Sequence, residues 1–172
     1  NNNFDIHEAW TEINLSEKFS IKGGRQEVAY DDHRIMGNVG WVQQARSHDL
    51  GIIKFNGFVE AHLGLAYNSN NKVNGSYEKM NYIWVHKNFN SFKGSLIRLD
   101  KDDLVTLGGR LSSTLKEISV NLNYYNQNNG GNLDAFLYGF DASYKLNNKF
   151  NIGFGFEKQS GLDIENLAFN PV

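Results

Sequence analysis

Charged side chains of both signs are concentrated in one short stretch, GRQEVAYDDHRIMGNVGWVQQARSHD, at residues 24–49. Its candidates for chemistry are Arg25, Asp31, Asp32, Arg34, Arg46 and His48. Arginines attract carboxylates and aspartates attract cations when they line a passage for solutes. The same side chains can also pair with one another and fold a loop. The stretch therefore predicts either the lining of a polar cavity or a structural ion-pair network.

The stretch does not follow a catalytic or metal-binding pattern. Ser47, His48 and Asp49 are consecutive, and consecutive residues of a strand point to opposite faces of a sheet, which separates a nucleophile from its base. The five histidines of the chain lack the spacing of a metal site such as H-x-x-x-H. We therefore expect no enzymatic activity, no metal and no other cofactor.

The composition of the 172 residues narrows the class of protein. A net charge of -2 gives no indication of nucleic-acid binding, and the absence of cysteine excludes a disulfide framework. A single proline and 13% aromatic residues suit a chain of paired strands, because proline cannot donate to a strand ladder. The mean hydropathy of -0.50 is compatible with a membrane barrel, whose strands alternate between apolar and polar residues.

Apolar residues recur at every second position, which is the period of a half-apolar strand. In the segment 58–67, for example, Leu63 and Leu65 share one face, whereas Glu60 and His62 share the other. The same period holds over residues 104–115, 118–126, 136–146 and 150–159, and weaker strands are expected at 4–15, 19–29, 44–56, 81–87 and 92–100. No segment has the 3.6-residue period of a helix. The sequence predicts an all-β, antiparallel up-and-down sheet of about ten strands.

Short and long connections alternate along this expected sheet. Tight turns are expected at residues 16–18, 56–57, 88–91, 116–117 and 147–149. Longer polar connections are expected at 30–43, 68–80, 127–133 and beyond 161, and the connection at 101–103 is unexpectedly short for its end of the sheet. Bacterial outer-membrane barrels have this asymmetry, with short periplasmic turns and longer outer loops.

The two faces of the expected strands differ in a way that favours a membrane barrel. The polar face carries many small residues, such as Gly108, Ser119 and Gly153, where a water-facing sheet would carry long charged side chains. The apolar face is almost unbroken from Val105 to Phe156, and aromatic residues lie near the strand ends, as in interfacial girdles. We therefore expect a transmembrane β-barrel, with its apolar face on lipid and its polar face toward a lumen.

The first third of the chain resembles the opening of the alginate-export family of outer-membrane β-barrels. The resemblance rests on the "GRQ" of the second strand and on the run YDDHRIMGNVGWVQQARSHD, with later support from GFGFEKQSG and AFNPV. In that family the chain is longer and the barrel has more strands. The resemblance implies that residues 1–172 form a single β-barrel domain, incomplete at its C-terminal end. It also implies a channel for an anionic polysaccharide, lined by basic side chains.

The expected lumen lining is mixed in charge, and this weakens the case for alginate itself. The candidate pore-lining residues are Arg25, Asp31, Asp32, Arg34, Arg46, His48, Glu60, His62, Arg98, Arg110 and Asp141. We therefore expect an outer-membrane porin-type channel that passes small polar or anionic solutes, saccharides among them, by diffusion. Its partners would be outer-membrane lipid, the solute and other outer-membrane proteins of a Gram-negative bacterium, with no nucleic acid.

Two alternatives remain open from the sequence. The first is a plugged barrel that serves as a structural or adaptor subunit of an outer-membrane assembly, for which residues 30–43 are long enough to fold into the lumen. The second is a soluble lipid-binding β-barrel, in which the apolar face would point inward.

Overall fold

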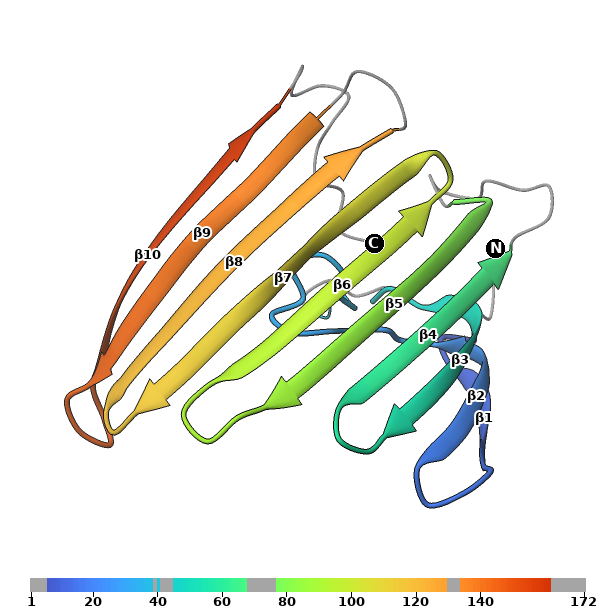
Figure 1. Cartoon of the computed structure of the whole chain (residues 1–172), viewed down its shortest axis with the longest axis horizontal. Coiled ribbons are helices and arrows are strands. Elements are labelled where there is room, and N and C mark those ends of the chain that lie inside the picture. Colours follow the sequence, from blue (N-terminus) through green and yellow to red (C-terminus); the bar gives the residue numbers. More distant parts are fainter. Residues whose placement is uncertain (1–5, 39, 41–44, 68–76, 130–133, 162–172) are drawn as a thin grey trace, which may run out of the picture.

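The computed structural model describes residues 6–38, 40, 45–67, 77–129 and 134–161. They form one antiparallel sheet of ten strands, arranged in the order of the sequence (Figure 1). The strands are β1 (Ala9–Asn14), β2 (Phe19–Gln26), β3 (His48–Asn56), β4 (Glu60–Tyr67), β5 (Lys79–Asn88), β6 (Lys93–Lys101), β7 (Leu104–Leu115), β8 (Ile118–Asn128), β9 (Asp134–Lys145) and β10 (Asn151–Ser160). The all-β, up-and-down sheet expected from the sequence is confirmed.

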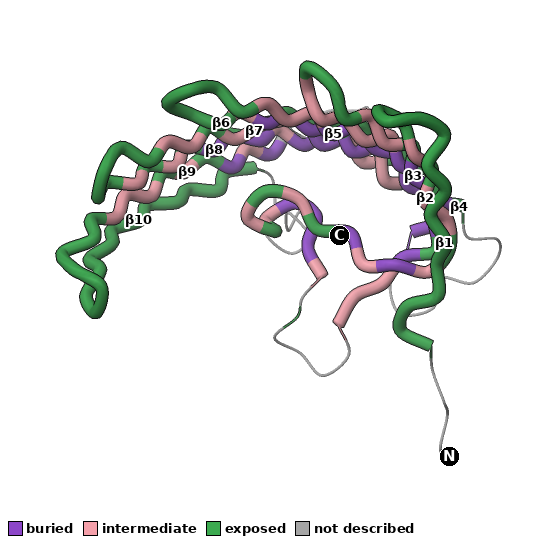
Figure 2. Tube along the Cα trace, turned by 90° about the horizontal axis from the view of Figure 1, so that it is seen from below, coloured by how far each residue is buried: buried purple, intermediate pink, exposed green. Residues whose placement is uncertain are grey.

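The sheet is strongly curved and open. Each strand pairs only with its neighbours in sequence, and within the described residues β1 and β10 are the two edge strands. Seen along the strands, the sheet forms an arc with a concave and a convex side (Figure 2). Ring closure, the feature that distinguishes a barrel from a curved sheet, is therefore not present in the described part of the chain.

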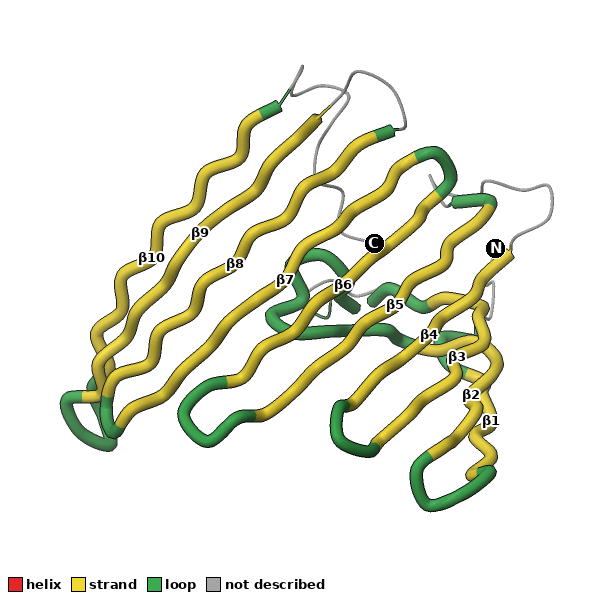
Figure 3. The backbone as a smooth tube through the Cα atoms, viewed as in Figure 1, coloured by secondary structure: helices red, strands yellow, loops and turns green. Residues whose placement is uncertain are grey.

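The connections follow the expected alternation of short and long. The turns β1–β2, β3–β4, β5–β6, β7–β8 and β9–β10 all lie at one end of the sheet (Figure 3). At the opposite end, the short β6–β7 connection is a two-residue turn, because Lys101 pairs with Leu104. Asp102, the first residue of this turn, has a positive φ of 51°, as tight hairpin turns require. The Asp102 carboxylate accepts hydrogen bonds from the backbone amides of Glu78 and Lys79, at 2.8 and 2.9 Å. These two hydrogen bonds attach the turn to the start of β5.

The convex face is covered by exposed apolar side chains. Pairing places Ile53 opposite Leu63, Leu63 opposite Ile83, and Leu107 on the same face two strands further along. Leu96 is 67% exposed and Phe154 is 65% exposed. Other exposed members of this face are Ile21, Leu65, Leu111, Leu122, Tyr124, Tyr138, Phe140, Tyr144, Ile152 and Phe156. Exposed apolar surfaces of this extent are unusual on monomeric soluble proteins.

The concave face carries the buried core of the molecule. Tyr82, Ile97, Leu99, Tyr125 and Leu137 point to this side and belong to one cluster of buried residues. The cluster is completed by Val28, Ile35 and Met36, which belong to the stretch 27–38 inside the arc (Figure 2). Burying an aliphatic or aromatic side chain of this size contributes about 1.5–3 kcal/mol, so the segment inside the arc is a substantial part of the fold.

Two glycines of the concave face lie directly beneath aromatic rings. Gly64 pairs with Tyr82 across β4 and β5, and Gly108 pairs with Tyr125 across β7 and β8. A Cβ atom added to Gly64 would lie 2.0 Å from the Tyr82 ring, and one added to Gly108 would lie 2.3 Å from the Tyr125 ring. The small residues that the sequence places on the polar face therefore make room for neighbouring aromatic side chains.

Candidate functional site

The described residues between β2 and β3 are 27–38, 40 and 45–47, and we call them the inner segment. Val28, Ile35 and Met36 are buried in the core cluster of the sheet. The inner segment thus lies inside the arc of the sheet (Figure 2).

The tip of the inner segment is a compact loop spanning residues 30–36. The His33 amide donates to the Tyr30 carbonyl at 3.0 Å, and the Tyr30 amide donates to the Met36 carbonyl at 3.1 Å. Asp31 and His33 have positive φ angles of 55° and 63°, a conformation that aspartate and histidine adopt more readily than most residues. A side chain at Gly37 would lie 2.6 Å from the His33 carbonyl oxygen. Asp31, His33 and Gly37 are therefore residue types that suit the backbone conformation of this loop.

An aromatic anchor, formed by Tyr30, His62, Tyr82 and Trp84, attaches the loop to β4 and β5. The Tyr30 ring stacks on Trp84 at 4.6 Å between centroids. Its hydroxyl lies 2.8 Å from Nδ1 of His62 and 3.0 Å from the Tyr82 hydroxyl. Nε1 of Trp84 donates to Oδ2 of Asp31 at 3.1 Å. Burial, followed by the adjacent Tyr82 hydroxyl, raises the pKa of the Tyr30 phenol well above its ordinary value, so the phenol stays neutral.

A charge network, formed by Asp32, Arg34, Arg110 and Glu157, attaches the same loop to β7 and β10. Nε of Arg34 lies 3.2 Å from Oδ2 of Asp32, and its Nη1 pairs with Glu157. Arg110 pairs with Asp32 from the wall of the sheet. Burial lowers the pKa of the Arg34 guanidinium, but the carboxylates of Asp32 and Glu157 raise it by more. Arg34 is therefore held in its charged form by two carboxylates.

A separate set of hydrogen bonds holds the inner segment near its two ends. The Glu27 carboxylate lies 2.8 Å from Nε2 of His7 and accepts a hydrogen bond from the Asn38 side chain at 2.6 Å. The Arg46 amide donates to the Asn38 carbonyl at 2.6 Å, so Asn38 links Glu27 and Arg46, which lie near the two ends of the segment. The hydrogen bond from His7, and then the one from Asn38, lower the pKa of the Glu27 carboxyl below its ordinary value.

Four of the residues expected to line a lumen meet in this site. They are Asp31, Asp32, Arg34 and Arg110. His62 joins the aromatic anchor, and its Nε2 lies 3.5 Å from the Glu60 carboxylate. The ion pairing expected of a structural ion-pair network is present, since Arg34 and Arg110 are both paired with carboxylates.

Three further expected residues lie on or beside the concave side but outside the charge network. His48 is buried, and its Nδ1 lies 2.9 Å from the Tyr77 hydroxyl. Asp141, on β9, accepts a long hydrogen bond of 3.4 Å from Asn121. Arg46 lies two residues before β3, at the loop end of the sheet.

Arg25 and Arg98 lie on the convex face, contrary to the expectation that they line a lumen. Arg25 pairs with Asp49 in the register of β2 and β3, and the two side chains form a bidentate ion pair at 2.9 and 2.8 Å. Arg98 lies opposite Leu107 and pairs with Asp100 at 3.1 Å. In both cases the strand register, which the sequence alone does not give, sets the face.

Sequence reasoning missed Tyr30, Tyr82 and Glu157 as members of the site. The side of the sheet on which Glu157 lies could have been predicted, because Glu157 alternates with the apolar residues of β10 and so belongs to the polar face. The side on which Tyr82 lies could not have been predicted, because β5 is apolar on both faces. Met80, Tyr82 and Trp84 form one apolar face, and Ile83 and Val85 belong to the other. Trp84, the fourth member of the aromatic anchor, is buried in the core cluster.

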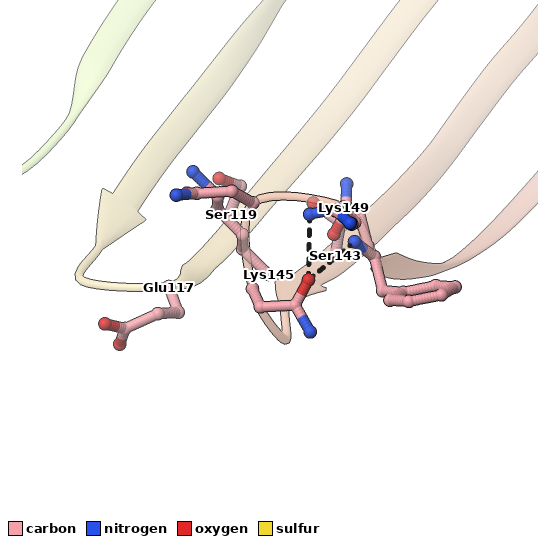
Figure 4. A pocket seen from close by; sticks show the side chains of 9 residues that line it. Glu117, Ser119, Ser143, Lys145 and Lys149 are labelled. Atoms are coloured by element: carbon pink, nitrogen blue, oxygen red, sulfur yellow. Dashed lines mark hydrogen bonds between the residues drawn. The ribbon is translucent and has the colours of Figure 1, made fainter.

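A small polar pocket lies far from the inner segment, at the turn end of β8–β10 (Figure 4). It is lined by Glu117, Ser119, Ser143, Lys145 and residues 147–151. The Asn147 side chain accepts hydrogen bonds from the amides of Lys149 and Phe150, at 2.8 and 3.1 Å. The pocket is therefore the hollow of a capped turn, and its polar groups already serve that turn.

Across residues 6–38, 40, 45–67, 77–129 and 134–161, no three histidine, aspartate or glutamate side chains are grouped so as to hold a metal ion. The described part of the chain also has no helix of the length and hydropathy needed to cross a membrane. Comparisons with protein-family models, with curated proteins and with solved structures found no match to this chain.

Proposed function

We propose that this chain forms part of an outer-membrane β-barrel channel that passes small polar or anionic solutes by diffusion. The observation that carries the proposal is the exposed apolar convex face, which includes Leu96, Leu107 and Phe154. Lipid would cover these side chains, whereas water would not. A soluble lipid-binding barrel would instead place its apolar face on the concave side.

The charge network supports an aqueous passage beside the inner segment. Side-chain exposure is 26% for Arg34, 21% for Asp32, 18% for Arg110 and 45% for Glu157. Four charged groups that reach solvent on the concave side are compatible with a water-filled lumen narrowed by the inner segment. Charged constrictions of this kind set which solutes pass.

The resemblance of the first third to alginate-export barrels supports the same class of protein. It does not extend to alginate as the solute, because the wall arginines expected to bind uronates are paired with carboxylates or lie on the convex face. The proposal therefore names a general porin-type channel, located in the bacterial outer membrane.

A second candidate is a plugged barrel that acts as a structural or adaptor subunit. The burial of Val28, Ile35 and Met36 beneath the sheet favours it, because these contacts hold the inner segment firmly in the arc. The two candidates differ in whether ions cross the protein, not in the lipid face they require.

Planar-bilayer recording of the full-length protein tests the proposal. Steady single-channel conductance is expected, and block by an oligouronate would add an anionic sugar to the solutes. Silence from protein shown to be folded in the membrane would reject the channel and favour the plugged subunit. Partition of the protein into the aqueous phase after detergent phase separation would reject both membrane candidates.

A further inference from the structure

On the convex face, charged and amide side chains lie mainly toward the loop end of the strands. Lys87 and Ser113 are polar residues nearer the turns, and their side chains donate to the carbonyls of the turn residues Phe58 and Ser91. Beyond them, the first charged or amide residue on this face is Arg25 on β2, Asp49 on β3, Asn81 on β5, Arg98 on β6, Asn126 on β8 and Lys158 on β10. We call the line through these six residues the polar border.

The polar border crosses the strands obliquely. Through the strand register, Lys158 is level with Leu96 of β6 and with Phe19 of β2. On β6 the border residue Arg98 lies two residues beyond Leu96 toward the loop end, and on β2 the border residue Arg25 lies six residues beyond Phe19. The border therefore shifts in one direction, toward the turn end, as the sheet proceeds from β2 to β10.

The slope of the polar border agrees with the tilt of strands in a membrane. Six residues along a strand span about 20 Å, and the steps from β2 to β10 span about 38 Å across the sheet, so the border is inclined by roughly 30° to the strand register. Strands of membrane barrels are tilted by about 35–45° from the membrane normal, and a flat membrane surface crosses their register at the same angle.

The width of the region between the polar border and the turns also fits a membrane. On β8, the convex residues run from Ile118 beside the turn to Asn126 at the border. This distance is about 26 Å along the strand and about 23 Å perpendicular to the border. The apolar band of a membrane barrel is about 25 Å tall.

The region between the polar border and the turns is a continuous apolar band. Ile53, Leu96 and Phe154 are exposed members of it on β3, β6 and β10. Among the described strand residues at this level, the charged side chains other than Lys87 belong to the concave face, as Arg110 does. A protein partner covers a patch whose outline follows its own shape, whereas a hydrocarbon layer requires a straight limit and a constant width across all strands.

We propose that the apolar band is the part of the convex face that contacts the hydrocarbon of a bilayer, and that the polar border is the lipid–water boundary at the loop end. The strands then cross the bilayer with a tilt of roughly 30°. The ion pairs of Arg25 with Asp49 and of Arg98 with Asp100 lie at the level of the lipid headgroups, where charge on the lipid face costs little. This proposal rests on the proposed membrane function and gives the position of the chain in the membrane.

Nitroxide labels on single cysteines, in the protein reconstituted in phosphatidylcholine vesicles, provide the test. The sequence has no cysteine of its own. Oxygen, which dissolves in lipid, and a water-soluble nickel chelate compete to relax each label. Leu96→Cys should collide mainly with oxygen, whereas Lys158→Cys should collide several-fold more with the nickel chelate. These two sites are level in the strand register, so only an oblique boundary separates them.

A second matched pair repeats the comparison elsewhere in the sheet. Ile53 and Asn126 are level in the register, but Ile53 lies inside the apolar band and Asn126 on the border. Ile53→Cys should therefore behave like Leu96→Cys, and Asn126→Cys should be more accessible to the nickel chelate. Asn81→Cys, an exposed site on the border at β5, replaces Lys158→Cys or Asn126→Cys if either variant fails to fold.

Equal behaviour of the two labels within each pair, both in lipid, would overturn the oblique boundary and leave the membrane function intact. A label at Leu96 that neither reagent reaches would show a protein partner on the band and would also overturn the proposal. Free access of the nickel chelate to Leu96 and Ile53 in folded protein would instead reject the membrane function itself.

Discussion

The phenol ring of Tyr30 lies nearly parallel to the indole of Trp84, with an interplanar angle of 22°. This contact joins the inner segment to the middle of the sheet, and the two hydrogen bonds of the phenol extend it to His62 and Tyr82. The inner segment is consequently attached through largely buried aromatic contacts and hydrogen bonds on one side and through partly exposed ion pairs on the other.

Tyr30→Phe should lower the free energy of unfolding by about 1–3 kcal/mol, because it leaves the buried polar groups of His62 and Tyr82 without the phenol. Urea unfolding of detergent-refolded protein, followed by tryptophan fluorescence, measures the change. Tyr67→Phe, at an exposed tyrosine of β4, is the matched control and should have almost no effect. Equal stability of the Tyr30 variant and the control would contradict the role assigned to the anchor.

Gly64→Ala should destabilise the fold by about 1–3 kcal/mol, the usual cost of overpacking, since the new Cβ would lie 2.0 Å from the Tyr82 ring. Gly51→Ala is the control, because a Cβ at that position meets no atom within 4 Å. Combining Gly64→Ala with Tyr82→Ala should remove most of the added cost, as in a double-mutant cycle. Simple additivity of the two substitutions would show that the ring does not cover the glycine.

The absence of native cysteine allows the burial of the inner segment to be measured directly. A maleimide should label Met36→Cys at least about tenfold more slowly than Thr114→Cys, corresponding to a local opening free energy above about 1.4 kcal/mol. Met36 is buried under the sheet, whereas Thr114 is exposed on the concave side. Labelling of both cysteines at the same rate would mean that the segment does not stay packed in the arc.

The Glu27 carboxyl makes stability depend on pH in a defined direction. Its pKa in the folded protein is below its ordinary value of 4.5, so its contribution is present above that value and is lost as the pH falls through the folded pKa. The wild-type protein should therefore lose stability below about pH 4.5, and Glu27→Gln should lose less over the same range. Thermal unfolding measured at a series of pH values compares the two proteins. Parallel pH profiles would contradict the assignment.

Much of the fold was predictable from the sequence because its strands alternate strictly. The segments at 104–115 and 118–126 correspond closely to β7 and β8, and the expected tight turns fall between paired strands. The concave core was not predictable, since β3 and β5 are apolar on both faces and period two then gives no orientation. The candidate site was partly predictable: Asp32, Arg34 and Arg110 follow from charge and alternation, but their meeting with Glu157 depends on the curvature of the whole sheet.

The pairing of Arg34 with Glu157 joins residues 123 positions apart, while every strand pairs only with its sequence neighbours. Hairpins of adjacent strands close short loops, whereas a contact over such a separation closes a long loop at a greater entropic cost. We therefore expect the Arg34–Glu157 pair to form late in folding, after the hairpins. A contact absent from the transition state acts mainly on the unfolding rate, so we expect this ion pair to affect the lifetime of the folded protein more than the rate at which it folds.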